Sequence, residues 1–112
     1  MNSQHAQSSL QEAMHILGGR WRMTIVWLLA NGPKRFNDLE KEIAGISRRM
    51  LIADLRRLEE GGVILRRESN DAKVKVEYEL TPRGHELSPI VDALRGWGTH
   101  LVKIQASTEE LT

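Results

Sequence analysis

The chain has 112 residues, and its 16 Lys and Arg side chains nearly balance its 15 Asp and Glu side chains, so any nucleic-acid surface must come from local segregation of charge. The absence of cysteine excludes disulfides, thiolate metal sites and cysteine nucleophiles. No apolar run approaches the ~20 residues of a membrane span and no signal peptide opens the chain. We therefore expect one cytoplasmic domain over 1–112, with no membrane as partner.

The N-terminal part predicts a short helix that ends at a glycine pair. Residues 1–7 are polar, and we expect them to fray. Either Ser8 or Ser9 can cap a helix that ends at Gly18-Gly19. No G-x-G-x-x-G or Walker pattern follows these glycines, so they indicate a helix end and not a phosphate loop. The apolar face of this helix carries Leu10, Met14 and Leu17.

Residues 21–30 form the most apolar segment and predict a buried helix. Its two tryptophans, Trp21 and Trp27, are interpreted as core side chains. The Gly32-Pro33 pair ends the helix, since glycine and proline rarely continue one.

A helix-turn-helix is predicted over 34–62. It begins with an extended link, after which Asn37 and Glu40 have the form of a capping box. They would open a short helix over 38–43. A glycine-containing turn then leads to a longer helix over 47–60.

The helix over 47–60 has both ends marked in the sequence. Ser47 is a good N-cap, and either Gly61 or Gly62 can end the helix. One narrow stripe, Leu51, Leu55 and Leu58, must face a core. The opposite face carries Arg49, Ala53, Arg56 and Glu60, with Ile52 at its edge. A buried stripe with a basic outer face is typical of a recognition helix, although an ordinary solvated helix would look the same on this segment alone.

After this helix the apolar period changes from 3.6 to 2. Residues 74–80 alternate between apolar and charged side chains, which predicts a half-buried strand. A second strand starts near Val63, and the polar segment 68–72 is the expected hairpin tip. A helix-turn-helix followed by a two-stranded hairpin over 63–80 is a winged helix.

Thr81 and Pro82 predict the start of a last helix over 81–104, in which Pro89 is expected to produce a bend. Its apolar side chains recur over about five turns, more than a small winged domain can cover. The surplus either packs on a second subunit, which we favour, or folds back on its own core. On this helix we assign the dimer interface to Leu87, Val91, Leu94, Trp97, Leu101 and Ile104.

The predicted fold class is α+β, mainly α: a winged helix-turn-helix with a two-stranded β-hairpin wing and N- and C-terminal dimerisation helices. Over 8–104 the chain also resembles the HxlR family of bacterial transcription regulators, which are related to MarR-type winged helices. The resemblance rests on Gly18-Gly19-Arg20-Trp21, Arg35-Phe36-Asn37-Asp38-Leu39, Gly45-Ile46-Ser47, Met50-Leu51, Leu55-Arg56, Leu58-Glu59, Val76-Glu77-Tyr78-Glu79-Leu80-Thr81 and Trp97-Gly98.

The resemblance implies a homodimer on an inverted-repeat operator, with the recognition helix in the major groove of double-stranded DNA and the wing at the minor groove. It also implies dimerisation through the N- and C-terminal helices, which adds Leu10 and Met14 to the dimer interface. Many family members carry a Cys-Pro pair near the N-terminus, and in some of them that cysteine senses oxidants. The aligned positions here hold Ser8 and Ser9, whose hydroxyls cannot do thiolate chemistry at neutral pH. Any signal would therefore be a small-molecule effector that remains unidentified, a partner, or the abundance of the protein itself.

Two groups of residues are the candidates for DNA contact. On the helix, Ser47 suits a phosphate at the positive helix end, and Arg49 suits the edge of a guanine. Ile52 either meets a thymine methyl or is partly buried. Arg35 either contacts phosphate or pairs with a carboxylate of the neighbouring helix. The full set is Ser47, Arg48, Arg49, Ile52, Ala53 and Arg56 on the helix, Asn70, Lys73 and Lys75 on the wing, and Lys34 and Arg35 before the first helix of the motif.

Other functions have weaker support in the sequence. The four histidines lack metal-ligand spacing, and no nucleophile–base pattern appears, so we expect no metal, no cofactor and no enzymatic activity. The alternative to a DNA-binding regulator is a winged-helix module that binds protein without specific DNA binding.

Overall fold

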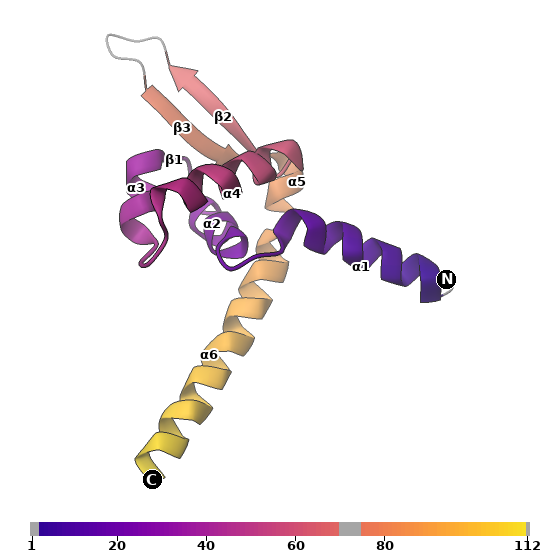
Figure 1. The fold of residues 1–112 in the computed structure, drawn as a ribbon, viewed down its shortest axis with the longest axis vertical. Coiled ribbons are helices and arrows are strands. Elements are labelled where there is room, and N and C mark those ends of the chain that lie inside the picture. The colour runs from indigo at the N-terminus through magenta and orange to yellow at the C-terminus, as the bar shows by residue number, and fades with distance from the viewer. Residues whose placement is uncertain (1–2, 70–74, 112) are drawn as a thin grey trace.

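A computed structural model describes residues 3–69 and 75–111. Helices dominate, and a small antiparallel sheet lies beside them (Figure 1). The elements in chain order are α1 (Ser3–Leu17), α2 (Arg22–Leu29), β1 (Lys34–Arg35), α3 (Phe36–Glu42), α4 (Arg48–Glu60), β2 (Ile64–Ser69), β3 (Lys75–Leu80), α5 (Pro82–His85) and α6 (Ser88–Leu111). The predicted order of helix-turn-helix, hairpin and C-terminal helix is confirmed.

The sheet has three strands in the order β1-β3-β2, one more than predicted. β2 and β3 form the hairpin, with Ile64 opposite Leu80 and Ser69 opposite Lys75. The residues predicted as an extended link form β1 instead, and Lys34 lies opposite Tyr78. The predicted tip over 68–72 began too early, because Glu68 and Ser69 still belong to β2. Asn70, Lys73 and Val74 lie outside the described residues.

The core lies where α2, α3 and α4 meet the sheet. α4 contributes the predicted stripe, since Leu51, Leu55 and Leu58 are all buried. Leu39 of α3 is buried, and Ile25 and Val26 of α2 have no exposed surface. Trp27, however, is 37% exposed, so its assignment to the core was wrong.

The first helix begins earlier than predicted. Residues expected to fray are helical from Ser3 onward, and neither Ser8 nor Ser9 acts as a cap. The hydroxyl of Ser9 donates to the carbonyl of His5 at 3.1 Å, four residues back in the same helix. A serine inside a helix can satisfy its hydroxyl in this way, so the residue type alone does not mark a helix start.

The start of α3 also differs from the prediction. The helix begins at Phe36, and the carboxylate of Asp38 accepts a hydrogen bond from the backbone N–H of Arg35 at 3.3 Å. Asn37 therefore lies inside the helix, and the Asn37–Glu40 capping box is wrong. Glu40 instead pairs with Arg48 of the next helix at 3.4 Å.

The predicted helix over 81–104 is two helices. Thr81 caps α5 as expected, since its Oγ accepts from the N–H of Gly84 at 3.0 Å, and Pro82 follows it. Gly84 lies against the sheet, where a Cβ would come within 2.2 Å of the carbonyl oxygen of Val63. α5 ends at once, and α6 starts again at Ser88. Pro89 thus falls in the first turn of α6, where proline is tolerated, and it does not bend a continuous helix.

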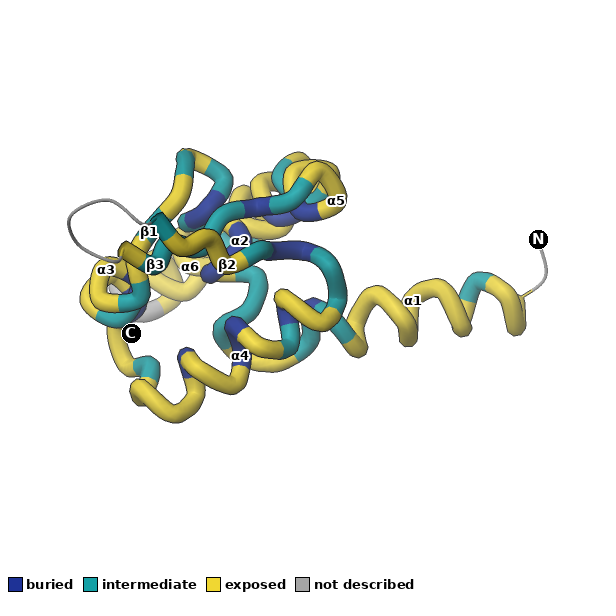
Figure 2. The backbone as a smooth tube through the Cα atoms, turned by 90° about the horizontal axis from the view of Figure 1, so that it is seen from above, coloured by how far each residue is buried: buried dark blue, intermediate teal, exposed yellow. Residues whose placement is uncertain are grey.

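Both terminal helices leave the body of the molecule. The radius of gyration is 16.7 Å, whereas a compact chain of this length would have about 13 Å. α1 and α6 project in different directions in Figure 1, and Figure 2 shows most of α1 exposed. Among the described helices, none is long and apolar enough to cross a membrane.

Only the first turns of α6 pack on the body. Val91 is 5% exposed and belongs to the core of its own chain, so its assignment to a dimer interface is corrected. Leu87 is half-buried against the same core. From Asp92 to Thr108, every residue of α6 except the half-buried Gly98 is exposed.

Candidate nucleic-acid interface

α4 is fixed at its N-terminus and along its inner face. Ser47 has an extended backbone, and its Oγ accepts a hydrogen bond from the N–H of Met50 at 3.0 Å. This bond satisfies one of the backbone donors that every helix start leaves unpaired. The remaining N–H groups of the first turn and the partial positive charge of the helix end favour an anion such as a phosphate.

The outer face of α4 is free to meet a partner. Arg49, Ala53 and Arg56 are exposed, as predicted. Arg49 and Arg56 make no hydrogen bond or ion pair with any residue of the described part of the chain. Ile52 is 42% exposed, so it lies on the accessible face and is not a core residue. Two unpaired guanidinium groups therefore flank an exposed apolar side chain on one helix face.

Other predicted contact residues are already engaged within the chain. Arg48 pairs with Glu40, and its guanidinium lies 4.7 Å from the centre of the Phe36 ring. The Nζ of Lys34 lies 2.9 Å from Glu42 Oε1. Arg35 is exposed, and its backbone N–H, not its side chain, contacts the carboxylate of Asp38. The side chains of Arg48 and Lys34 are therefore less free to contact DNA than those of Arg49 and Arg56.

Of the three wing residues selected, the described structure places one. Lys75 is exposed at the start of β3, opposite Ser69. Asn70 and Lys73 lie outside the described residues.

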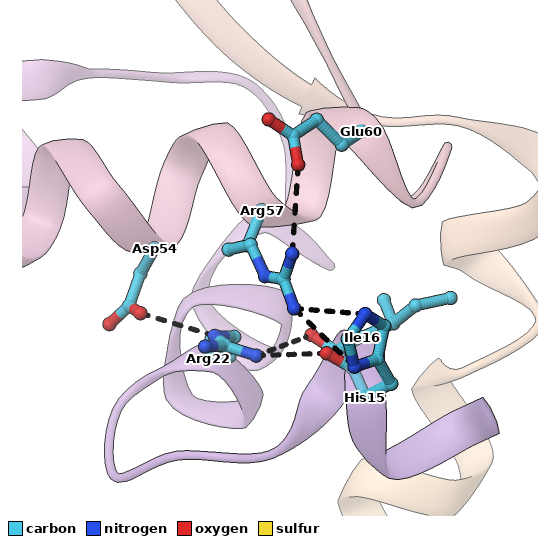
Figure 3. A network of polar contacts seen from close by, with 6 residues as sticks. All are labelled: His15, Ile16, Arg22, Asp54, Arg57 and Glu60. Atoms are coloured by element: carbon cyan, nitrogen blue, oxygen red, sulfur yellow. Dashed lines mark hydrogen bonds and ion pairs between the residues drawn. The ribbon is translucent and has the colours of Figure 1, made fainter. Parts of the chain in front are cut away.

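A charged residue on the inner face of α4 was missed by the sequence analysis. Asp54 is only 4% exposed, and its Oδ1 lies 3.1 Å from Nε of Arg22 in α2. Arg22 Nη1 also donates to the carbonyl oxygens of His15 and Ile16, at 3.2 Å each, where α1 ends (Figure 3). One guanidinium thus joins α4 to the ends of α1 and α2. The sequence feature that could have identified Asp54 is its position beside the buried stripe of Leu51, Leu55 and Leu58. A carboxylate that faces a core needs a partner.

A second contact joins α1 to α4 near their C-terminal ends. The Nη2 of Arg57 in α4 lies 3.1 Å from Nε2 of His15 in α1 (Figure 3). Its Nη1 lies 3.8 Å from the carboxylate of Glu60, one turn further along α4. The helix that carries the exposed arginines is therefore held against the N-terminal helix by two guanidinium groups.

Within residues 3–69 and 75–111, no group of three or more His, Asp and Glu side chains could hold a metal ion. The groups that this surface offers to a ligand are the guanidinium groups of Arg49 and Arg56 on a firmly held helix. A capped helix with an apolar inner face and unpaired arginines outside suits the binding of a polyanion.

The model of the HxlR-like helix-turn-helix family matches residues 16–106. The chain belongs to this family. The helix-turn-helix transcriptional regulator YkvN of Bacillus subtilis is 41% identical to it over 83 residues, 74% of this chain and 70% of that protein. With this membership, the protein is a DNA-binding transcription regulator.

Solved structures agree with this assignment. The redox regulator HypR in its reduced form superposes with a TM-score of 0.80 at 32% identity, over 88% of this chain and 98% of that one. The putative helix-turn-helix regulator YtcD gives a TM-score of 0.77 at 35% identity, over 92% of this chain and 99% of that one. The winged-helix class expected from the sequence is confirmed.

The Asp54–Arg22 pair yields a first prediction. Asp54→Ala leaves the mostly buried guanidinium of Arg22 without its counter-charge, so the free energy of unfolding should fall by roughly 3 kcal/mol. Glu60→Ala removes a carboxylate from the same helix, but its pair with Arg57 is exposed, so its effect should stay below about 0.5 kcal/mol. Urea denaturation of both variants measures the difference. Equal losses would show that the buried pair contributes no more than a surface pair.

Proposed function

We propose that the protein regulates transcription in the cytoplasm as a homodimer bound to an inverted-repeat operator. In this proposal α4 enters the major groove and the β2–β3 hairpin lies at the minor groove. The observation that supports it best is the outer face of α4, where Arg49 and Arg56 are exposed and unpaired while the inner face is locked in the core.

The residues of this surface have different roles in the proposal. Arg49 lies in the first turn of α4, the part of a recognition helix that meets base edges, and its planar fork matches O6 and N7 of guanine. Ala53 is small enough to allow close approach, and Ile52 can meet a thymine methyl. Ser47, with the first N–H groups of the helix, binds phosphate, and Lys75 does so from the wing.

The homodimer is supported by the apolar side chains that α6 exposes. Ile90, Leu94, Trp97, Leu101 and Ile104 are between 39% and 61% exposed. They follow one another at alternating steps of four and three residues, the 3.5-residue period of a two-helix seam. α1 adds Leu10, 68% exposed, and Met14, 49% exposed. Large apolar side chains aligned in this way on a soluble chain indicate a protein–protein contact.

The signal that controls DNA binding differs in chemistry from that of a thiol sensor. HypR is named a redox regulator, but this chain has no cysteine to oxidise. The proposal therefore leaves a small-molecule effector, a partner or the abundance of the protein as the controlling input.

Selection from a pool of random duplexes tests the function directly. We expect one inverted-repeat sequence to emerge and to bind about a thousandfold or more tighter than random DNA at moderate salt. A winged-helix module that binds protein and not DNA would enrich no sequence and would show no such ratio.

Two single variants test the division between base reading and phosphate binding. Arg49→Ala should weaken binding to the selected site by about 1–3 kcal/mol and to random DNA much less. Lys75→Ala should weaken both by similar factors and make the salt dependence shallower by about one unit for each lost contact. Titrations of both variants on both duplexes across a salt series measure these effects. If Arg49→Ala loses the same binding free energy on both duplexes, Arg49 contacts phosphate and does not read a base.

The dimer interface is tested by charge on α6. Replacing Trp97 and Leu101 together by Glu should give monomers in sedimentation at micromolar concentration, because the seam would carry four acidic groups. Val102→Glu is the matched control, since Val102 is 64% exposed but lies off the seam, and it should leave the dimer intact. Circular dichroism of each variant reports whether the chain has folded. An unmutated protein that sediments as a monomer would refute the dimer.

A further inference from the structure

A hollow of about 360 Å³ lies between α4 and the sheet, and its lining joins three predicted DNA-contact residues, Arg48, Ile52 and Arg56, to residues of the sheet that were not predicted as contacts. Ile52 and Val76 provide apolar surface in it, from the helix and from β3. The helix and the sheet also provide its polar side chains, which are Arg48, Arg56 and Glu59 of α4, Arg66 of β2 and Tyr78 of β3. Arg66 and Tyr78 lie directly opposite each other in the β2–β3 ladder. Neither was singled out by the sequence analysis.

We propose that this hollow binds a phosphodiester group of the DNA backbone, held by Arg56, Arg66 and the hydroxyl of Tyr78. The proposal rests on the proposed function, in which α4 enters the major groove and the hairpin lies at the minor groove.

The geometry of a duplex provides the first argument. A major groove and the adjacent minor groove are separated by one sugar–phosphate strand. A protein with a helix in one groove and a hairpin at the other must therefore have that strand between the two elements. α4 packs beside β2 in this chain (Figure 1). Side chains of α4, β2 and β3 line the hollow.

The charges around the hollow suit an anion. Arg56 has no ion-pair or hydrogen-bond partner among the described residues. Among the described residues Arg66 forms an ion pair only with Glu68, at 3.7 Å, and both side chains are at least half exposed, so this pair is weak. The apolar surface of Ile52 and Val76 suits the carbon face of a deoxyribose. Two cationic side chains with apolar surface between them can bind both the phosphate and the sugar of a DNA strand. An inorganic ion would use only the cations.

Tyr78 provides an independent observation. Tyr78 as a whole is half-buried, and its hydroxyl makes no hydrogen bond with any other described residue. Burial raises the pKa of Tyr78 above its ordinary value, the charge of Arg66 lowers it, and the charge of Glu59 raises it. A phenol is already protonated at neutral pH at its ordinary pKa, and the upward shift does not change this, so the O–H can donate to a phosphate oxygen. A donor that has no acceptor among the described residues is available to a ligand.

Glu59 has the opposite effect on the same site. Its carboxylate lines the hollow with the two arginines, and it makes no ion pair with any described residue. It repels a phosphate that enters, so it should weaken binding to any duplex by a similar factor. In this proposal Glu59 limits the sequence-independent affinity that Arg56 and Arg66 create.

The central test compares two adjacent arginines on β2. Arg66 lines the hollow, whereas the next residue, Arg67, is ion-paired with Glu79 and does not line it. Arg66→Gln and Arg67→Gln change the net charge equally. We expect Arg66→Gln to make the slope of log Kobs against log[salt] shallower by about 0.9 for each subunit and to weaken selected and random duplexes by the same factor. Arg67→Gln should change the slope by much less.

Two further variants separate hydrogen bonding from charge. Tyr78→Phe should weaken both duplexes without changing the salt slope, because it removes a donor but no charge. Glu59→Gln should strengthen binding to both duplexes. Thermal unfolding of every variant shows whether it is folded, and the opposite direction expected for Glu59→Gln cannot result from a general loss of structure.

The outcomes also distinguish this proposal from the function on which it rests. If no duplex is preferred by the unmutated protein, the proposed function fails. If a sequence is preferred but Arg66→Gln and Arg67→Gln behave alike, only the phosphate site is refuted. Calorimetric titration with inorganic phosphate separates a free ion from the DNA backbone. Arg66-dependent binding of inorganic phosphate, together with an unchanged salt slope for DNA, would assign the hollow to a soluble phosphate and overturn the proposal.

Discussion

The position of α4 depends on one guanidinium group, that of Arg22. It pairs with the buried carboxylate of Asp54 and binds two carbonyl oxygens at the end of α1. Removing a carboxylate from water is costly, and a single partner often fails to compensate for that cost. Here the guanidinium of Arg22 has three acceptors, the carboxylate of Asp54 and the carbonyl oxygens of His15 and Ile16. It therefore links α4 to the C-terminal end of α1. Hydrophobic packing alone would let α4 slide or rotate by small amounts, whereas these directional bonds define its orientation relative to α1.

The sequence predicted well those parts of the fold that depend on residues close together in the chain. Ser47 lies three residues before the N–H that it caps, and Thr81 has the same relation to Gly84. The buried stripe of α4 follows from the helical period alone. The same helical period places the arginines on the opposite face. The exposure of Arg49, Ala53 and Arg56 could therefore be predicted correctly.

What the sequence did not predict depends on contacts between distant residues. Asp54 and Arg22 are 32 positions apart, and no local pattern pairs them. β1 is only two residues long and exists because β3 offers it a partner. The segment 81–104 has the period of one helix, but α5 packs against the sheet, with Gly84 close to the carbonyl of Val63, and ends at His85 before α6 begins at Ser88. The hollow beside Tyr78 is likewise a product of how α4 and the sheet pack, so neither Arg66 nor Tyr78 stands out in the sequence.

The interruption between α5 and α6 has a consequence for how two subunits would be arranged. α6 leaves the body after Val91, and its direction is set by the two residues that separate it from α5. In a dimer joined along α6, that direction determines the distance and the angle between the two copies of α4. The number of base pairs separating two half-sites would then be encoded at this short joint, far from any residue that touches a base. Evolution could alter operator spacing there while leaving the sequence read within each half-site unchanged.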